Sequence, residues 1–182
     1  MKLVIGTEGM FFLSLIMAFV YLSYVSGFEP GQQQALDIKS TGIFSLFLFS
    51  SSGTFWLAEK NYNEGNIKRL KMWLMATILL GVAFLFGQGK EYFHLIEMQK
   101  ITLSSSLFGT SFYTLTGFHG FHVFVGLIIL SIILWLTFSG DFNNEKKSSV
   151  IKTVGMYWHF VDIVWVVVFT VVYILPKLGI LK

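Results

Sequence analysis

Long apolar segments alternate with short polar segments along the whole chain. The apolar segments lie at about 3–25, 41–58, 71–92, 107–138 and 150–175. Each is close to the roughly 20 residues that a helix needs to cross the hydrocarbon core of a bilayer. The longest segment, 107–138, is expected to tilt or to protrude from the membrane. The pattern predicts an all-α fold, a polytopic membrane helix bundle of about five transmembrane helices, with residues 1–182 forming a single membrane domain.

The polar segments between the spans contain turn signals. Residues 63–66 read Asn-Glu-Gly-Asn, which is typical of a turn. Pro176 predicts the end of the last helix, because proline lacks the backbone N–H that a helix needs. No internal repeat and no low-complexity tract interrupts this organisation.

Composition supports a lipid environment and excludes several classes of protein. Only 13% of the 182 residues are charged and 54% are hydrophobic, with a mean hydropathy of +0.69, whereas soluble domains carry about 25% charged residues. No loop is long enough to form a soluble catalytic domain. The chain has no cysteine, which excludes disulfides and thiolate metal ligands. The net charge of +3 comes from lysines in the loops, so we expect lipid surfaces and no nucleic acid as partners.

The distribution of Lys and Arg predicts the orientation of the chain. With five spans, the N-terminus shares a side with the loop between spans two and three and the loop between spans four and five. Eight basic residues fall on that side and five on the other, which favours a cytoplasmic N-terminus and an external C-terminus in a bacterial cytoplasmic (inner) membrane. The first group is Lys2, Lys60, Lys68, Arg69, Lys71, Lys146, Lys147 and Lys152, and the second is Lys39, Lys90, Lys100, Lys177 and Lys182.

Two carboxylates in or beside the apolar segments are candidates for function. Glu8 lies within the first span, and a carboxylate there suggests a proton relay, an ion site, a buried pair or a lipid contact. The alternative is that Glu8, two turns from the N-terminus, simply reaches the headgroup region. Glu91 follows Lys90 at the end of the third span, where we expect a solvated or ion-paired side chain.

Histidines and an aspartate form two pairs with helical spacing. His119 and His122 are three residues apart, as are His159 and Asp162, so each pair is expected to share one helix face. His159 and Asp162 could pair with each other, and Asp162 needs some partner because an unpaired buried carboxylate is costly. Four glycines of the fourth span predict close helix packing; they are Gly109, Gly117, Gly120 and Gly126.

Metal and haem sites are the competing interpretation of these histidines. Two histidines on one helical turn cannot hold a haem from opposite sides, so a haem would need His119 or His122 together with His159 of another helix. A non-haem site would need His119, His122, His159 and a carboxylate to converge from different helices. Hydrogen bonding between helices is the interpretation we favour, so we predict no metal and no catalytic residue in this chain.

Four motifs occur in order and resemble subunit III of the haem-copper terminal oxidases, the cytochrome c oxidase family. The motif Tyr157-Trp158-His159-Phe160-Val161-Asp162-Ile163-Val164-Trp165 resembles the family's final-helix signature. Two features depart from the family pattern. The chain begins at the segment resembling the third of seven mitochondrial helices, as in a short five-helix bacterial form, and it lacks a histidine pair after Trp56-Leu57-Ala58. The other three motifs are 7–12, Leu79-Leu80-Gly81 leading to Gln88-x-x-Glu91-Tyr92, and 109–123.

The resemblance implies a subunit without redox centres or a catalytic site of its own. Haem and copper belong to subunits I and II, and subunit III packs on subunit I, supports proton uptake and binds phospholipid during aerobic electron transport. Glu8 resembles the family's carbodiimide-reactive carboxylate, so Glu8 and Glu91 become candidates for proton uptake or lipid contact. The polar signature positions are interpreted as structural or lipid-contacting; they are His119, His122, His159 and Asp162.

Other functions stay open at the level of sequence. The complex could instead be a quinol oxidase, or the chain could be an accessory subunit of a nitric oxide reductase, because related third subunits serve each of these. A stand-alone transporter or ion channel using Glu8 and Asp162 is disfavoured by the missing inverted repeat. A membrane redox enzyme would require a bound metal.

Overall fold

A computed structural model describes residues 1–26, 36–98, 100–102, 106–140 and 148–178. Within these ranges the chain is almost entirely helical and has no strand, and five helices are long and apolar enough to cross a membrane. This confirms the predicted all-α bundle. The helices are α1 (Lys2–Ser26), α3 (Ile38–Asn63), α4 (Ile67–Glu97), α5 (Leu107–Phe138) and α6 (Ser148–Phe169), the last extended by a π-helical turn η2 (Thr170–Ile174) and α7 (Leu175–Lys177).

Helices α3 and α4 extend several residues beyond the apolar segments that predicted them, and α5 has the bounds of its segment. Where along each helix the membrane begins and ends stays a prediction. Part of the linker between the first two spans, Lys146, Lys147 and Lys182 lie outside the described residues.

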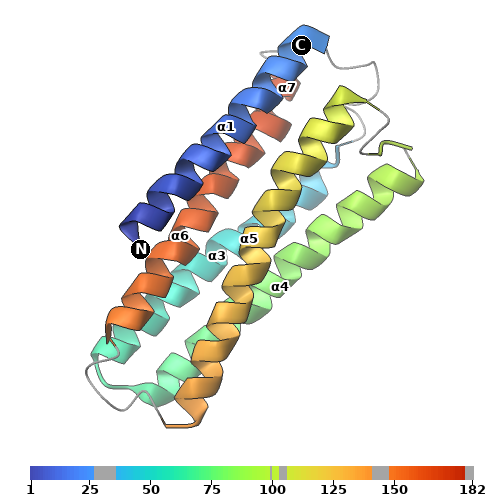
Figure 1. Cartoon of the computed structure of the whole chain (residues 1–182). Helices are drawn as coiled ribbons and strands as arrows, with labels where there is room; N and C mark the ends of the chain where they lie inside the picture. Colours follow the sequence, from blue (N-terminus) through green and yellow to red (C-terminus); the bar gives the residue numbers. More distant parts are fainter. Residues whose placement is uncertain (27–35, 99, 103–105, 141–147, 179–182) are drawn as a thin grey trace.

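The five helices form an elongated bundle in which α5 has a central place (Figure 1). Helix α5 contacts α1, α4 and α6, while α3 packs along α4 and α6. The start of α4 and the end of α5 lie at one end of the bundle, and the C-terminal end of the chain lies at the other, near the end of α1. Side chains of α5 therefore meet three helices and can link them.

Polar side chains define where the helices begin. Asp37, Asn66 and Ser106 each accept a hydrogen bond from a backbone N–H three residues later, at 3.1, 3.2 and 3.0 Å, which satisfies one of the free donors of a helix N-terminus. The turn predicted at residues 63–66 joins α3 to α4. Gly65 has a φ of 74° there, a backbone conformation that glycine adopts without strain.

The last helix ends at Lys177, one residue past the proline that predicted its end. The backbone N–H of Leu175 reaches back five residues to the carbonyl of Thr170 through the π-helical turn, and a further helical turn contains Pro176. A proline ring clashes with the carbonyl one turn back in a regular α-helix. The wider π turn directly before the proline relieves this clash.

Aromatic side chains fill the interior and bind α6 to α3. Trp158 and Trp165 of α6 are fully buried. Their indole N–H groups donate to the hydroxyls of Ser51 and Ser45 on α3, at 3.0 and 2.8 Å. A buried indole needs such an acceptor, so these two bonds fix the rotation of α6 against α3.

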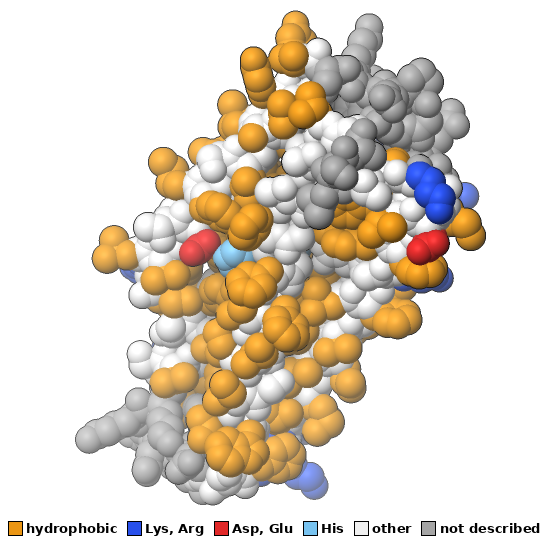
Figure 2. Space-filling view, turned by 45° about the vertical axis from the view of Figure 1, so that its right-hand side comes forward, with side chains coloured by type: hydrophobic (Ala, Val, Ile, Leu, Met, Phe, Trp, Pro, Cys, Tyr) orange, Lys and Arg blue, Asp and Glu red, His pale blue; other side chains and the backbone are white. Residues whose placement is uncertain are grey.

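The outer surface is as apolar as lipid contact requires. Figure 2 shows hydrophobic side chains spread over the face on the α4 and α5 side, with few charged side chains, most of them at its margins, and one acidic side chain beside a histidine. Large hydrophobic residues are exposed on every long helix. Such a surface is stable in a bilayer and not in water.

Candidate functional site

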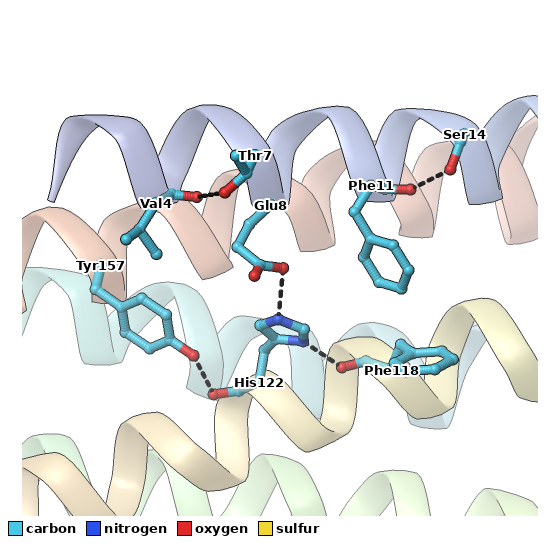
Figure 3. Close-up of polar contacts among 8 residues, drawn as sticks. All are labelled: Val4, Thr7, Glu8, Phe11, Ser14, Phe118, His122 and Tyr157. Atoms are coloured by element: carbon cyan, nitrogen blue, oxygen red, sulfur yellow. Dashed lines mark hydrogen bonds and ion pairs between the residues drawn. The ribbon is translucent and has the colours of Figure 1, made fainter.

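Glu8 pairs with His122 between α1 and α5. The carboxylate projects from the second turn of α1 toward the imidazole in the middle of α5 (Figure 3), and Glu8 Oε2 lies 3.1 Å from His122 Nε2. The His122 side chain is 14% exposed and that of Glu8 33%. The carboxylate is thus the more exposed member of the pair.

The hydrogen bonds of His122 restrict where its protons are. Nδ1 lies 2.7 Å from the backbone carbonyl of Phe118, and a carbonyl only accepts, so Nδ1 carries a hydrogen. The contact between Nε2 and Glu8 then holds one proton, either on Nε2 of an imidazolium facing a carboxylate or on the carboxyl facing a neutral imidazole. Both arrangements have zero net charge, which is the cheapest condition for two ionisable groups in a membrane.

Side chains from three helices surround this pair. The ring of Phe12 meets His122 edge to face at 4.9 Å, and Phe11 meets Phe118 in the same way at 5.1 Å. The hydroxyl of Tyr157 on α6 donates to the backbone carbonyl of His122 at 3.0 Å (Figure 3). The segment 7–12 therefore places a carboxylate and two rings on the α5 face that holds the histidine.

His119 and His122 both meet the ring of Phe12, as expected for two residues on one helix face, but the other neighbours of His119 are aromatic. The His119 ring is fully buried, stacks on Trp165 at 4.7 Å and meets Phe84 edge to face at 5.9 Å. Neither ring nitrogen has a hydrogen-bond partner among the described residues. The prediction of hydrogen bonding between helices is wrong for His119, because α5 turns this ring toward the aromatic interior and not toward a polar group.

Ser52 of α3 links His159 and Asp162 of α6. The Ser52 hydroxyl lies 2.9 Å from His159 Nδ1 and donates to Asp162 Oδ2. The two α6 side chains share a face, as predicted, and each is hydrogen-bonded to the serine; direct pairing was the other possibility. Since Ser52 donates to Asp162, the bond with His159 requires Nδ1–H as the donor. The partner that Asp162 needs is therefore a hydroxyl of another helix.

Glu91 has a tyrosine hydroxyl as its partner and no ion pair among the described residues, whereas a solvated or ion-paired side chain was the expectation. Its side chain is half-buried, and its Oε2 accepts a hydrogen bond of 2.8 Å from the hydroxyl of Tyr173, which is itself buried. Lys90, the adjacent cation, is exposed. Because neighbouring residues on a helix point 100° apart, Lys90 faces outward while Glu91 faces the last turns of the chain.

The glycines of α5 allow close packing within this chain. A Cβ at Gly126 would lie 2.8 Å from Trp158, and one at Gly120 would lie 2.7 Å from Oε1 of Gln88. Gln88 of α4 donates to the backbone carbonyl of Thr116 at 2.7 Å and so joins α4 to α5. Gly120 is thus part of a contact inside this chain, which agrees with the close helix packing that the glycines predicted.

The candidate metal ligands do not converge. His119 is stacked on Trp165, His122 faces Glu8, and His159 faces Ser52. In the part of the chain that the structure describes, no group of three or more His, Cys, Asp or Glu side chains is arranged to hold a metal ion.

Sequence reasoning missed the hydroxyl groups that form hydrogen bonds between the helices. Ser52, Tyr157 and Tyr173 each satisfy a polar group of another helix. One signal was present in the sequence, since Thr41, Ser45 and Ser52 recur with a spacing that places them on one face of α3. Serine and threonine are nevertheless common in membrane helices, so spacing alone does not name the partner.

The fold and these contacts define a class, the polytopic helical membrane proteins whose ionisable side chains pair between helices. A family model for cytochrome c oxidase subunit III matches residues 1–177. The chain is 34% identical over 169 residues to cytochrome c oxidase subunit 3 of Synechocystis sp., covering 92% of this chain and 71% of the relative. It is 33% identical over 183 residues to the Bacillus subtilis subunit 3, covering 97% and 85%, and 36% identical over 169 residues to a probable subunit 3 of Mycobacterium leprae, covering 93% and 83%. The chain belongs to the cytochrome c oxidase subunit III family.

Proposed function

We propose that this chain is the non-catalytic third subunit of a haem-copper terminal oxidase that receives electrons from cytochrome c. It packs mainly on subunit I, also contacts subunit II, and lies in the bacterial cytoplasmic membrane as part of the aerobic respiratory chain. Family membership over residues 1–177 supports the assignment. The donor set of this chain does not fit haem or copper, because its histidines face different partners, so these cofactors are assigned to subunits I and II.

The Glu8–His122 pair supports a role of this subunit in proton uptake or lipid contact. The pair holds one proton across a 3.1 Å contact, and one third of the Glu8 side chain is exposed. A proton that reaches the carboxylate from outside the bundle meets a group whose charge His122 already balances. The same exposed edge is available to a phospholipid headgroup. Glu91, hydrogen-bonded to Tyr173, is the second candidate of this kind.

Co-purification tests the assignment directly. The chain, carrying an affinity tag, is isolated from native membranes in mild detergent, and the product is examined by haem absorption and by oxygen consumption with reduced cytochrome c or with quinol. We expect bound haem and cytochrome c oxidase activity. A complex that accepts quinol only, or one that reduces nitric oxide, would replace the proposed electron donor, and a purified chain with no haem-containing partner would overturn the assignment.

Deletion of the gene tests the role of the subunit in the complex. We expect an oxidase core that starts at a normal rate but loses activity over successive turnovers. A core that is inactive from the first turnover would place a catalytic contribution in this chain and contradict the proposal.

A further inference from the structure

An apolar groove runs between α4 and α5 on the outside of the bundle. Its volume is about 570 Å³, and its lining includes Val82 and Leu85 of α4 and Phe124, Ile128, Ser131 and Trp135 of α5. Ser131 is the only one of these six residues with a hydroxyl group, and it donates to the carbonyl of Leu127 at 2.8 Å. The groove thus offers its occupant hydrocarbon surface, and Trp135, 67% exposed, stands at one end.

The length of the groove corresponds to one leaflet of a bilayer. From Phe124 to Trp135 a helix rises about 16 Å at 1.5 Å per residue, which is roughly half of the 30 Å hydrocarbon core. A transmembrane helix of a partner needs a surface that extends over the full core. A single acyl chain needs a surface of about one leaflet, which is the length of this groove.

The same helix faces carry a cation at the end of the groove. On α4, Lys68 and Lys71 have the helical spacing that places them in line with Val82 and Leu85. On α5 the line ends at Phe138, and the ammonium group of Lys71 lies 4.5 Å from the centre of this ring. The first turn of α4 contains no acidic residue, and the N-terminal end of a helix itself favours anions.

We infer that this groove binds an anionic phospholipid, with one acyl chain along Val82, Ile128 and Trp135 and the phosphate at Lys71. The apolar lining, the length of one leaflet and the cation at the end fit this single ligand class. The inference depends on the membrane location of the chain and not on its proposed role in an oxidase. Lys71 lies on the side for which the Lys and Arg distribution predicts the cytoplasm, where anionic lipids attract basic residues.

Fluorescence quenching tests the site with the full-length chain in nanodiscs. The discs contain unlabelled phosphatidylcholine and a small fraction of either phosphatidylglycerol or phosphatidylcholine with brominated acyl chains. The emission of Trp135 is obtained as the difference between the natural chain and Trp135→Phe. We expect brominated phosphatidylglycerol to quench Trp135 at a several-fold lower mole fraction than brominated phosphatidylcholine does.

A matched lysine provides the control for charge. Lys60 also lies over an aromatic ring, that of Trp56 at 5.8 Å, but its neighbours include Glu59 and Glu64 and no apolar groove. Lys71→Gln should reduce the preference for phosphatidylglycerol roughly five-fold, which corresponds to about 1 kcal/mol. Lys60→Gln and Lys71→Arg should preserve it.

The outcomes separate this site from its alternatives. Equal quenching by the two brominated lipids, or a preference that survives Lys71→Gln, would overturn the inference and leave only the lipid that surrounds any membrane protein. Ile128→p-benzoylphenylalanine, photolysed in native membranes, gives the second measurement. A lipid adduct on this residue supports the site, and an adduct to a polypeptide shows that a partner helix fills the groove.

Discussion

At the scale of single residues, two hydroxyl groups and one histidine form hydrogen bonds with three carboxylates of the bundle. Glu8 has His122, Asp162 has Ser52 and Glu91 has Tyr173. Each pair joins two elements that are distant in sequence. An unpaired ionisable group inside a bilayer costs several kcal/mol, so each pair also selects the helix arrangement in which both partners meet.

Substitutions of Glu8 separate its hydrogen bond from its proton. Glu8→Gln keeps an amide that can donate to Nε2 of a neutral His122, so thermal unfolding in detergent should be nearly unchanged. Glu8→Leu leaves Nε2 without a partner and should lower the free energy of unfolding by about 1–2 kcal/mol. Under the proposed function, oxidase with Glu8→Gln loses activity in fewer turnovers than the natural complex does.

Equal destabilisation by the two Glu8 variants would contradict the hydrogen-bond argument. If Glu8→Gln changes neither the loss of activity over turnovers nor the bound lipid, Glu8 acts only as an anchor at the membrane interface.

Removal of the Ser52 hydroxyl should destabilise the bundle more than an ordinary serine substitution does. Ser52→Ala leaves both His159 and Asp162 without their hydrogen-bond partner, and we expect a loss of about 1–2 kcal/mol in the free energy of unfolding. Ser52→Thr retains the hydroxyl and should retain most of the stability. Ser50→Ala, on an exposed position of the same helix, is the control and should have little effect.

At the scale of the helices, small residues of α5 determine how closely its neighbours approach. Gly126 lies against Trp158 of α6 and Gly120 against Gln88 of α4. In a membrane, van der Waals packing and hydrogen bonds between helices replace the hydrophobic driving force of soluble proteins. The contacts made possible by these glycines are therefore a principal source of stability in this bundle.

Two alanine substitutions on α5 test this packing. A Cβ at Gly126 would lie 2.8 Å from the fully buried Trp158, so Gly126→Ala should destabilise the chain by about 1–3 kcal/mol. At Gly117 the nearest atom, the Tyr92 hydroxyl, is 3.7 Å away, an ordinary contact. Gly117→Ala should be neutral or slightly stabilising, because alanine favours the helix by up to about 1 kcal/mol. Thermal unfolding measures both, and equal effects would contradict the packing argument.

At the scale of the whole molecule, successive helices run in opposite directions, so the two ends of the bundle lie on opposite sides of a membrane. The start of α4, the end of α5 and the start of α6 share one end of the bundle (Figure 1). Lys68, Arg69, Lys71 and Lys152 belong to that end. The surplus of basic residues there favours the cytoplasm.

Reporter fusions test this orientation. Green fluorescent protein should fluoresce when fused in the α3–α4 turn at Gly65 and not at the C-terminus, and alkaline phosphatase should be active at the C-terminus and not at Gly65. These expectations follow because the first reporter matures in the cytoplasm and the second outside it. The reverse pattern would invert the topology, and identical behaviour at the two sites would contradict a fold with three spans between them.

The sequence by itself determined the class of fold, the five helices, the α3–α4 turn and the family. These properties depend on the length of apolar segments, on local turn residues and on ordered motifs, and all of these are features of the linear sequence. The sequence also singled out Glu8, His122, His159 and Asp162, because ionisable residues in apolar segments are rare.

Only the tertiary structure decided which groups meet. The rotation of each helix about its axis sends His119 into an aromatic cluster and His122, one turn later, to Glu8. The same rotation gives Asp162 a serine in place of His159, turns Glu91 toward Tyr173 and forms the α4–α5 groove. Helix rotation depends on the packing of all neighbours at once, and the spacing of residues within one helix carries no information about it.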